Sequence, residues 1–323
     1  MSPRENGDQV VVVGAGISGV ACARELRAAG MGVRVLDRGH HPGGRMASKQ
    51  WSGRAVDLGA SYLTAAHPEF RAVVEDWRER GLAREWTDTF GALEGGTWTA
   101  KQGPMRWGTP AGMRSLVVDL AAGLDVQRHE VVALAELKGL SAAAVVLAMP
   151  DPQAMRLIDP DHPMAAHLDR EFEPVIALAA RWGERAWDDV SATGRFDGGF
   201  VNTDRVLGWV ADDGRRRGDD APVLVAHSTP DFARQHLDDP EAAGPEMVRA
   251  LREVMGLSEP VEVHVHRWSL ARPVGEREAA YALETGPQGL LGVCGDGWGL
   301  SPKVETAWRS GRDLGRALAE RLS

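Results

Sequence analysis

Cysteine and lysine are scarce in this chain of 323 residues, which contains two cysteines and four lysines. So few cysteines exclude the disulfide framework of small secreted domains and favour a reducing compartment. No uninterrupted apolar stretch reaches the length of a bilayer, and the first nine residues are polar, without the apolar segment of a signal peptide. We therefore expect a cytoplasmic protein that is not embedded in a membrane.

Excess positive charge is also absent, since 37 Lys and Arg stand against 46 Asp and Glu, a net charge of −9. This balance disfavours nucleic acid or an anionic membrane as a partner. The one sharp basic run, Arg215–Arg217, is flanked by aspartates, and we expect it to be a solvated loop. The chain has no GxSxG motif and no His/Cys cluster with metal-ligand spacing, so we expect neither a serine-hydrolase triad nor a metal site.

The chain does contain a strand, loop, helix and second strand near its start. Val10–Val13 predict a buried parallel strand, which the motif GAGISG follows. Gly14 permits the tight turn, Gly16 lets the backbone approach a pyrophosphate, and Gly19 lets the helix pack on the strand. The helix N-terminus offers free N–H groups to phosphates, and Asp37 ends the second strand, where a carboxylate accepts ribose hydroxyls. The pattern predicts a dinucleotide-binding unit.

A second motif, Gly43-Gly44-Arg45-Met46, follows closely and makes FAD the leading ligand. Alternating strands and helices in the outer parts of the chain predict a parallel sheet, and the central half predicts an antiparallel one. We expect an α/β fold in which a Rossmann-like FAD-binding domain is interleaved with an α+β substrate domain. The expected boundaries are 1–62, 104–150 and 286–323 for the former, and 63–103 and 151–285 for the latter.

Three local expectations are specific enough to test. Apolar spacing predicts a helix over residues 70–84. The segment 91–110, rich in Gly, Thr and Trp, predicts short strands and loops. Ser301 and Pro302 suit the N-cap and first position of the last helix.

The order of motifs resembles the flavin-containing amine oxidoreductase superfamily, and most closely bacterial renalase-like FAD-dependent oxidoreductases. The resemblance runs nearly end to end, through GAGISG, GGRMAS, VDLGASYLT, VVLAMPDPQAM, HRWSLARP and CGDGWGLSPKVETAWRSG. It implies an amine-oxidase/p-hydroxybenzoate-hydroxylase-like fold and non-covalent FAD. One departure is the short stretch 134–144, which leaves little room for the hairpin usually inserted there.

The resemblance also implies roles for individual residues. Arg45 lies near the pyrophosphate and flavin, Val131 meets adenine through its backbone, and Asp296 binds the ribityl-pyrophosphate region. The last helix begins at Val304 and Glu305 and points at the flavin N1/C2=O edge, where negative charge builds when a hydride reaches N5. The expected cofactor-binding residues are Gly14, Gly16, Ile17, Ser18, Gly19, Asp37, Arg38, Gly44, Arg45, Met46, Gly59, Ala60, Ser61, Tyr62, Val131, Gly295, Asp296, Val304 and Glu305.

The activity that the resemblance implies is hydride transfer from a small reduced substrate to flavin N5, with reoxidation by oxygen. We place no lysine at the position that amine oxidases of this superfamily use near N5, which favours a renalase-like oxidation of dihydro-NAD(P) isomers. The alternatives are an amine or amino-acid oxidase, a tailoring dehydrogenase of secondary metabolism, and a nonenzymatic structural flavoprotein. The expected partners are a small molecule, such as a reduced nicotinamide, and oxygen.

The flavin itself carries the chemistry in this scheme, and no side chain is assigned as catalytic. Four residues are candidates for contact with the reacting atoms, each with structural packing as the competing interpretation: Tyr62, His227, Tyr281 and Trp298. Cys294 is expected to be a small apolar residue that closes a buried strand rather than a covalent tether for the flavin.

Overall fold

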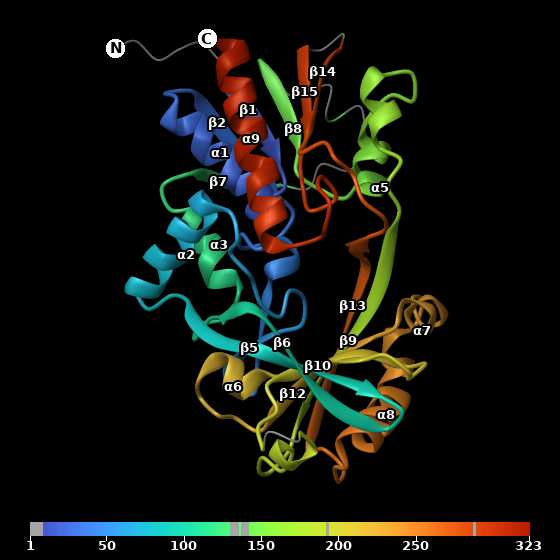
Figure 1. The fold of residues 1–323 in the computed structure, drawn as a ribbon. Helices are drawn as coiled ribbons and strands as arrows, with labels where there is room; N and C mark the ends of the chain where they lie inside the picture. Colours follow the sequence, from blue (N-terminus) through green and yellow to red (C-terminus); the bar gives the residue numbers. More distant parts are fainter. Residues whose placement is uncertain (1–8, 130–135, 137–141, 192–193, 287–288) are drawn as a thin grey trace.

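The computed structural model describes residues 9–129, 136, 142–191, 194–286 and 289–323, which build two large sheets at opposite ends of the molecule (Figure 1). The first sheet has five parallel strands and one antiparallel edge strand, β14. Its spatial order is β14 (Ala282–Gly286), β15 (Gly289–Val293), β8 (Ala144–Leu147), β1 (Gln9–Val13), β2 (Gly32–Asp37) and β7 (Asp125–Arg128). The predicted Rossmann-like parallel sheet is confirmed.

Strand β1 is apolar throughout because both faces of this sheet are covered. Val10 and Val12 face a core shared with helices α1 (Ile17–Ala28), α2 (Pro68–Glu79), α3 (Arg114–Leu120) and α9 (Val304–Leu322). Val11 and Val13 face a second core, built with the segment that follows α5 (Asp151–Ala154). The carboxyl ends of the parallel strands therefore meet at one edge, where the glycine-rich loops lie.

Helices α1 and α9 approach closely because glycines stand where they cross. A Cβ on Gly311 would lie 1.8 Å from the Ser18 carbonyl oxygen, and one on Gly315 would lie 2.7 Å from the Cys22 oxygen. The last helix is therefore fixed against the helix that opens the dinucleotide motif.

The second sheet has seven strands and is antiparallel except where β10 runs parallel to β5. Its order is β13 (Glu262–Pro273), β9 (Phe172–Arg181), β12 (Val223–Ser228), β11 (Leu207–Asp212), β10 (Gly198–Val201), β5 (Arg84–Glu94) and β6 (Thr97–Gly108). Strands β9 and β13 run side by side from this sheet toward the first one (Figure 1).

The two faces of the second sheet have different neighbours. Helices α7 (Pro230–Gln235) and α8 (Gly244–Met255) cover one face through an apolar core. The other face meets residues 56–62, which begin within β4 (Arg54–Asp57), the second strand of a hairpin with β3 (Ser48–Trp51). The segment expected to line the flavin thus lies between the two sheets. The domain boundaries remain a prediction; α2, placed with the substrate domain there, packs into the core of the first sheet.

Two of the local expectations are wrong here. The helix expected to reach residue 84 ends at Glu79, and the segment 91–110 belongs to one long hairpin of β5 and β6. Gly95 and Gly96 form its two-residue turn with φ of +58° and +81°, the left-handed backbone of the turns that connect twisted strands. This Gly-Gly pair was the signal for the hairpin.

Candidate functional site

Two glycines of the dinucleotide loop leave no room for a side chain, whereas the third faces open space. A Cβ on Gly14 would lie 2.5 Å from the Ala148 oxygen, and one on Gly19 would lie 2.0 Å from the Gly14 oxygen. A Cβ on Gly16 would meet only the Gly44 Cα, at 3.9 Å. Gly14 and Gly19 therefore hold the loop together, while Gly16 leaves room for a ligand to approach the backbone.

Helix α1 begins beside this open space without a side-chain cap and without an acidic residue in its first turn. Ile17 and Ser18 are buried at this end of the helix. An uncapped N-terminus with no negative side chain presents its positive dipole end and N–H groups to an anion. Residues 14–19 therefore fit the pyrophosphate of a dinucleotide.

Asp37 closes the loop from the end of β2. Its Oδ2 accepts a hydrogen bond from the Ala15 N–H (2.6 Å), and its Oδ1 accepts one from the Gly39 N–H (2.7 Å). Each carboxylate oxygen keeps a second lone pair, so the ribose role expected for Asp37 is compatible with both contacts. The next residue, Arg38, has an exposed side chain.

The Gly43–Met46 motif is attached directly to the dinucleotide loop. The Gly43 N–H donates to the Ala15 oxygen (2.9 Å), and Gly44 has a φ of +55°. A Cβ on Gly44 would lie 3.1 Å from the Gly16 Cα, so the two motifs touch backbone to backbone. Met46 is buried beneath them.

Arg45 meets the glycine-rich loop that precedes the last helix. Its guanidinium binds both oxygens of Asp296, at 2.5 and 2.9 Å, and donates to the Ala271 oxygen at 3.1 Å. Phe172, at the start of β9, lies under the guanidinium, 5.5 Å from its carbon to the ring centre. Arg45 and Asp296, two expected cofactor residues from opposite ends of the chain, therefore form one unit. Asp296 directly follows the buried Cys294 and Gly295 in the chain.

The segment Leu58–Tyr62 is held on one side by Arg45. The Ala60 N–H donates to the Arg45 oxygen (2.9 Å), and a Cβ on Gly59 would lie 2.0 Å from that oxygen. The second sheet holds it on the other side. The Leu58 oxygen accepts from Trp268 Nε1 (2.9 Å) and is 3.0 Å from His227 Nε2, and Trp209 Nε1 donates to Ser61 Oγ (3.2 Å).

A buried ionic network lies below this segment, and sequence reasoning missed it. Arg216 donates to the Ser61 oxygen (3.0 Å) and pairs with Asp213, and Arg217 pairs with Asp57 (2.8 Å). Positive charge from Arg216, Arg217 and Arg54 overcomes the effect of burial and lowers the pKa of Asp213 far below its usual range.

The solvated loop expected at Arg215–Arg217 is thus wrong. These residues form the end of helix α6 (Asp213–Arg217), and Arg216 is 1% exposed. The partners that allow Arg216 and Arg217 to be buried are the flanking Asp213 and the distant Asp57. In the sequence alone, arginines beside aspartates are compatible with a solvated loop and with a buried ionic network.

Helix α9 begins at Val304, as the resemblance implied, but its N-cap residue is Lys303, so the expectation for Ser301 and Pro302 is wrong. Its N-terminus has no side-chain cap hydrogen bond. The Glu305 carboxylate accepts from the Ala66 and His67 N–H groups, at 3.0 and 2.5 Å, and so fixes the start of α2. That this helix end points at the flavin N1/C2=O edge stays a prediction.

Arg170 is a further buried arginine that sequence reasoning did not select. It is 6% exposed and donates to the carbonyl oxygens of Val274, Gly275 and Gly297. These carbonyls belong to the connection after β13 and to the loop that carries Asp296. Arg170 therefore fixes the loop conformation through backbone contacts.

The four catalytic candidates lie in different surroundings. Trp298 is buried under Arg277, whose guanidinium carbon is 4.1 Å from the ring, and Tyr281 packs half-buried against the first core. Burial and, secondarily, the Arg216 charge lower the pKa of His227 to about 4, so His227 is neutral at physiological pH. Tyr62 alone belongs to the segment Leu58–Tyr62, which is expected to line the flavin. Val131 lies outside the described residues.

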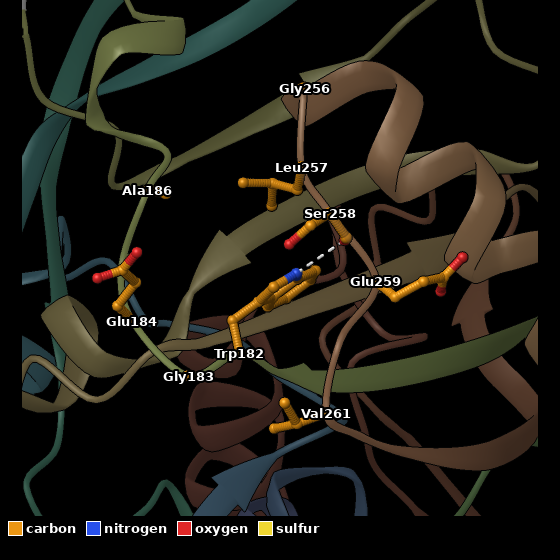
Figure 2. A pocket seen from close by; sticks show the side chains of 9 residues that line it. All are labelled: Trp182, Gly183, Glu184, Ala186, Gly256, Leu257, Ser258, Glu259 and Val261. Carbon is orange, nitrogen blue, oxygen red and sulfur yellow. Dashed lines mark hydrogen bonds between the residues drawn. The ribbon is translucent and has the colours of Figure 1, made fainter.

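Cavities lie beside the second sheet, lined by residues that the structure describes. One, of about 470 Å³, is lined by Trp86, Phe90, Met105 and Gly198 among others, and two of these rings contact each other beside Tyr62. The other, of about 380 Å³, surrounds Trp182, whose Nε1 donates to the Ser258 oxygen (Figure 2). Trp182 follows the far end of β9, roughly 30 Å along the strand from Phe172. The second cavity is therefore remote from the Arg45 unit.

Within the described part of the chain, no group of three or more His, Cys, Asp or Glu residues is arranged to hold a metal ion. No helix among the same residues is long and apolar enough to cross a bilayer.

Two protein-family models match consecutive parts of the chain. Residues 12–77 match the NAD(P)-binding Rossmann-like domain, and residues 90–317 match the family described as flavin containing amine oxidoreductase. Renalase from Mus musculus is 25% identical over 324 residues, which cover 90% of this chain and 93% of that protein.

Solved structures show the same fold at low sequence identity. Cyclohexylamine oxidase from Brevibacterium oxydans IH-35A superposes with a TM-score of 0.73 at 14% identity, covering 98% of this chain and 99% of that one. A putrescine oxidase bound to putrescine superposes with a TM-score of 0.67 at 16% identity, covering 97% and 98%. The α/β architecture and its association with the second sheet are therefore common to these proteins.

Proposed function

Because the chain belongs to the flavin containing amine oxidoreductase family and is an FAD-dependent oxidoreductase, we propose that it oxidises dihydronicotinamide substrates with oxygen as the final acceptor. Bound FAD supplies the two-electron acceptor for this chemistry, in which a dihydronicotinamide, a proton and O2 give an oxidised nicotinamide and H2O2. The protein's residues position the substrate and exclude competing groups.

The observation that carries this proposal is the lack of a base beside Ser61 and Tyr62 among the described residues. Aromatic rings of Trp86, Phe90 and Trp209 face Tyr62. Burial raises the pKa of the Tyr62 phenol, which therefore stays protonated. Burial lowers the pKa of His227 to about 4, so its imidazole is a weak proton acceptor, and its Nε2 lies 3.0 Å from the Leu58 oxygen. A dihydropyridine loses a hydride without losing a separate proton, so it needs no base, whereas an ammonium substrate must first be deprotonated.

The lysines support the same choice. The structure describes Lys49, Lys101 and Lys303, and all three side chains are exposed. Lys138 lies outside the described residues. None of the described lysines is therefore a counterpart of the lysine that amine oxidases of this superfamily use near flavin N5. The likeness to renalase, in addition, extends over most of both chains.

Peroxide release from a substrate panel tests the proposal. The purified yellow protein is incubated in air with reduced nicotinamide isomers, putrescine and cyclohexylamine, and H2O2 is measured with free FAD as the control. We expect turnover with at least one dihydronicotinamide and none with the amines. Turnover with an amine alone would make the chain an amine oxidase, the activity that its solved neighbours name. No turnover by a fully flavinated protein would favour a structural flavoprotein.

A further inference from the structure

A partly open aromatic surface lies on the sheet face that meets the flavin-lining segment. Tyr62 packs there against Trp86, Phe90 and Trp209, and Phe200 extends the cluster on β10. The Phe90 and Phe200 ring centres lie 4.8 and 4.9 Å from that of Trp209. The Phe200 side chain is 45% exposed although it belongs to this cluster. Such a surface suits one face of a flat ring.

Arg106 reaches this cluster from β6. Its guanidinium carbon lies 4.0 Å from the centre of the Phe90 ring, and its Nη1 donates to the Asp88 carbonyl oxygen. Arg106 is half-buried, and no carboxylate among the described residues forms an ion pair with it. The Asp88 carboxylate acts on Arg106 through its charge alone, because its oxygens accept hydrogen bonds from Gln102 (2.8 Å) and Thr89 (2.8 Å).

Arg106 differs from the deeply buried Arg216 and Arg217, which have carboxylate partners. Arg216 and Arg217 are each neutralised by Asp213, and Arg217 also by Asp57. A charge that is partly removed from water without a partner is costly, and an arginine binds carboxylate or phosphate with two parallel hydrogen bonds. Arg106 therefore has the chemistry of an anion-binding side chain whose anion comes from outside the chain.

Trp86 gives a second, independent indication of a ligand. It is 5% exposed, and its Nε1 has no hydrogen-bond partner in the structure. Trp86 and Phe90 both line the cavity of about 470 Å³ beside the cluster. Buried indole N–H groups normally find an acceptor, so a ligand that carries oxygen acceptors would satisfy this one.

We propose that the substrate carries an anionic group, a carboxylate or a phosphate, that Arg106 binds while the flat ring of the substrate lies on the aromatic cluster. This inference rests on the proposed function, because it concerns the substrate of the same site. It assigns Arg106 a binding role and disfavours cationic amines, which Arg106 repels.

Charged and neutral ring probes test the role of Arg106. The holoprotein is titrated with benzoate, phenyl phosphate and the neutral benzamide, and binding is followed by flavin absorbance and by tryptophan fluorescence. In Arg106→Gln, we expect the affinity for at least one anion to fall about tenfold or more, and that for benzamide to stay within about twofold. Arg106→Lys keeps the charge and loses less affinity. The control is Arg249→Gln on the exposed face of α8, where binding is unchanged.

Each outcome decides whether Arg106 binds an anionic group. A selective loss of benzoate identifies a carboxylate as the anion, and a selective loss of phenyl phosphate identifies a phosphate. Equal loss of all three probes, or no loss of either anion in a variant with wild-type melting temperature and flavin content, overturns the inference. A protein without flavin would remove the proposed function, but the fluorescence titrations would still decide the role of Arg106.

Discussion

Arg45 and Asp296 form a bidentate ion pair, at 2.5 and 2.9 Å, between positions 251 residues apart in the chain. The pair joins the Gly43–Met46 motif to the loop before helix α9, and it is only partly exposed, at 27% and 17% for the two side chains. The two motifs that most strongly indicate FAD are therefore held together by charge.

Removal of either partner should weaken cofactor binding. We expect Arg45→Ala and Asp296→Asn each to reduce the affinity for FAD by about tenfold or more, because each leaves the other charge uncompensated beside the ligand. The measurement is titration of the deflavinated protein with FAD, followed by quenching of flavin fluorescence. Arg181→Ala, which breaks an exposed pair with Glu262, is the matched control and should bind FAD as the wild type does.

The crossing of α1 and α9 predicts a strong effect of one methyl group. In Gly311→Ala, the new Cβ would lie 1.8 Å from the Ser18 oxygen, so the helices must separate. We expect the free energy of unfolding to fall by about 2 kcal/mol or more. Gly183→Ala is the control, because a Cβ there has no atom within 4 Å. Equal urea midpoints for both variants would contradict the close packing.

His227 predicts a defined pH dependence. Burial lowers the pKa of His227 to about 4 in the folded state, below its value of about 6.5 in the unfolded chain. Between these values the unfolded state binds a proton that the folded state does not, so stability falls as the pH falls from about 6.5 to about 4. In His227→Gln, the free energy of unfolding should fall less over this range. The exposed His41→Gln should retain the wild-type slope, and an unchanged slope in His227→Gln would refute the assignment.

Cys294 predicts the mode of cofactor attachment. Burial raises the pKa of its thiol to about 12, so the nucleophilic thiolate is absent at neutral pH. Acid precipitation of the protein should therefore release all of its FAD into the supernatant, and Cys294→Ala should retain its yellow colour. Flavin that stays with the precipitated wild type but is released from Cys294→Ala would show a covalent bond.

The buried ionic network of Arg216, Arg217 and Asp213 predicts a large loss of stability when one member is removed. Arg216→Met leaves Asp213 with less compensation and the Ser61 oxygen without a donor, and should cost about 3–5 kcal/mol. Asp213→Asn should have a comparable cost. Chemical denaturation checks both, with the exposed Arg234→Met as the control. A cost below about 1 kcal/mol would mean that the network does not hold the segment.

The sequence predicted those parts of the fold in which local patterns have local causes. Four consecutive valines and a glycine loop specify β1 and α1, because a strand covered on both faces must be apolar and the loop needs Gly14 and Gly19. The β5–β6 hairpin was missed although Gly95 and Gly96 mark its turn, since the flanking strands include polar residues that do not alternate cleanly.

Features that depend on distant contacts were not predictable in the same way. The burial of Arg216 depends on Asp57 and on the Ser61 backbone, which lie more than 150 positions away in the chain. The run of arginines carries no sign of those partners. Arg170 likewise becomes important only because the connection after β13 and the loop after Asp296 come to lie beside it.

Anaerobic stopped-flow spectroscopy of the purified protein, mixed with a reduced nicotinamide isomer and then with oxygen, tests whether the bound flavin takes a hydride from a dihydronicotinamide. We expect rapid loss of the oxidised flavin absorbance on mixing and its return, with H2O2, when oxygen is admitted. A flavin band that every dihydronicotinamide leaves unchanged while an amine bleaches it, or a protein that binds no FAD, would show that the protein does not oxidise dihydronicotinamides through FAD.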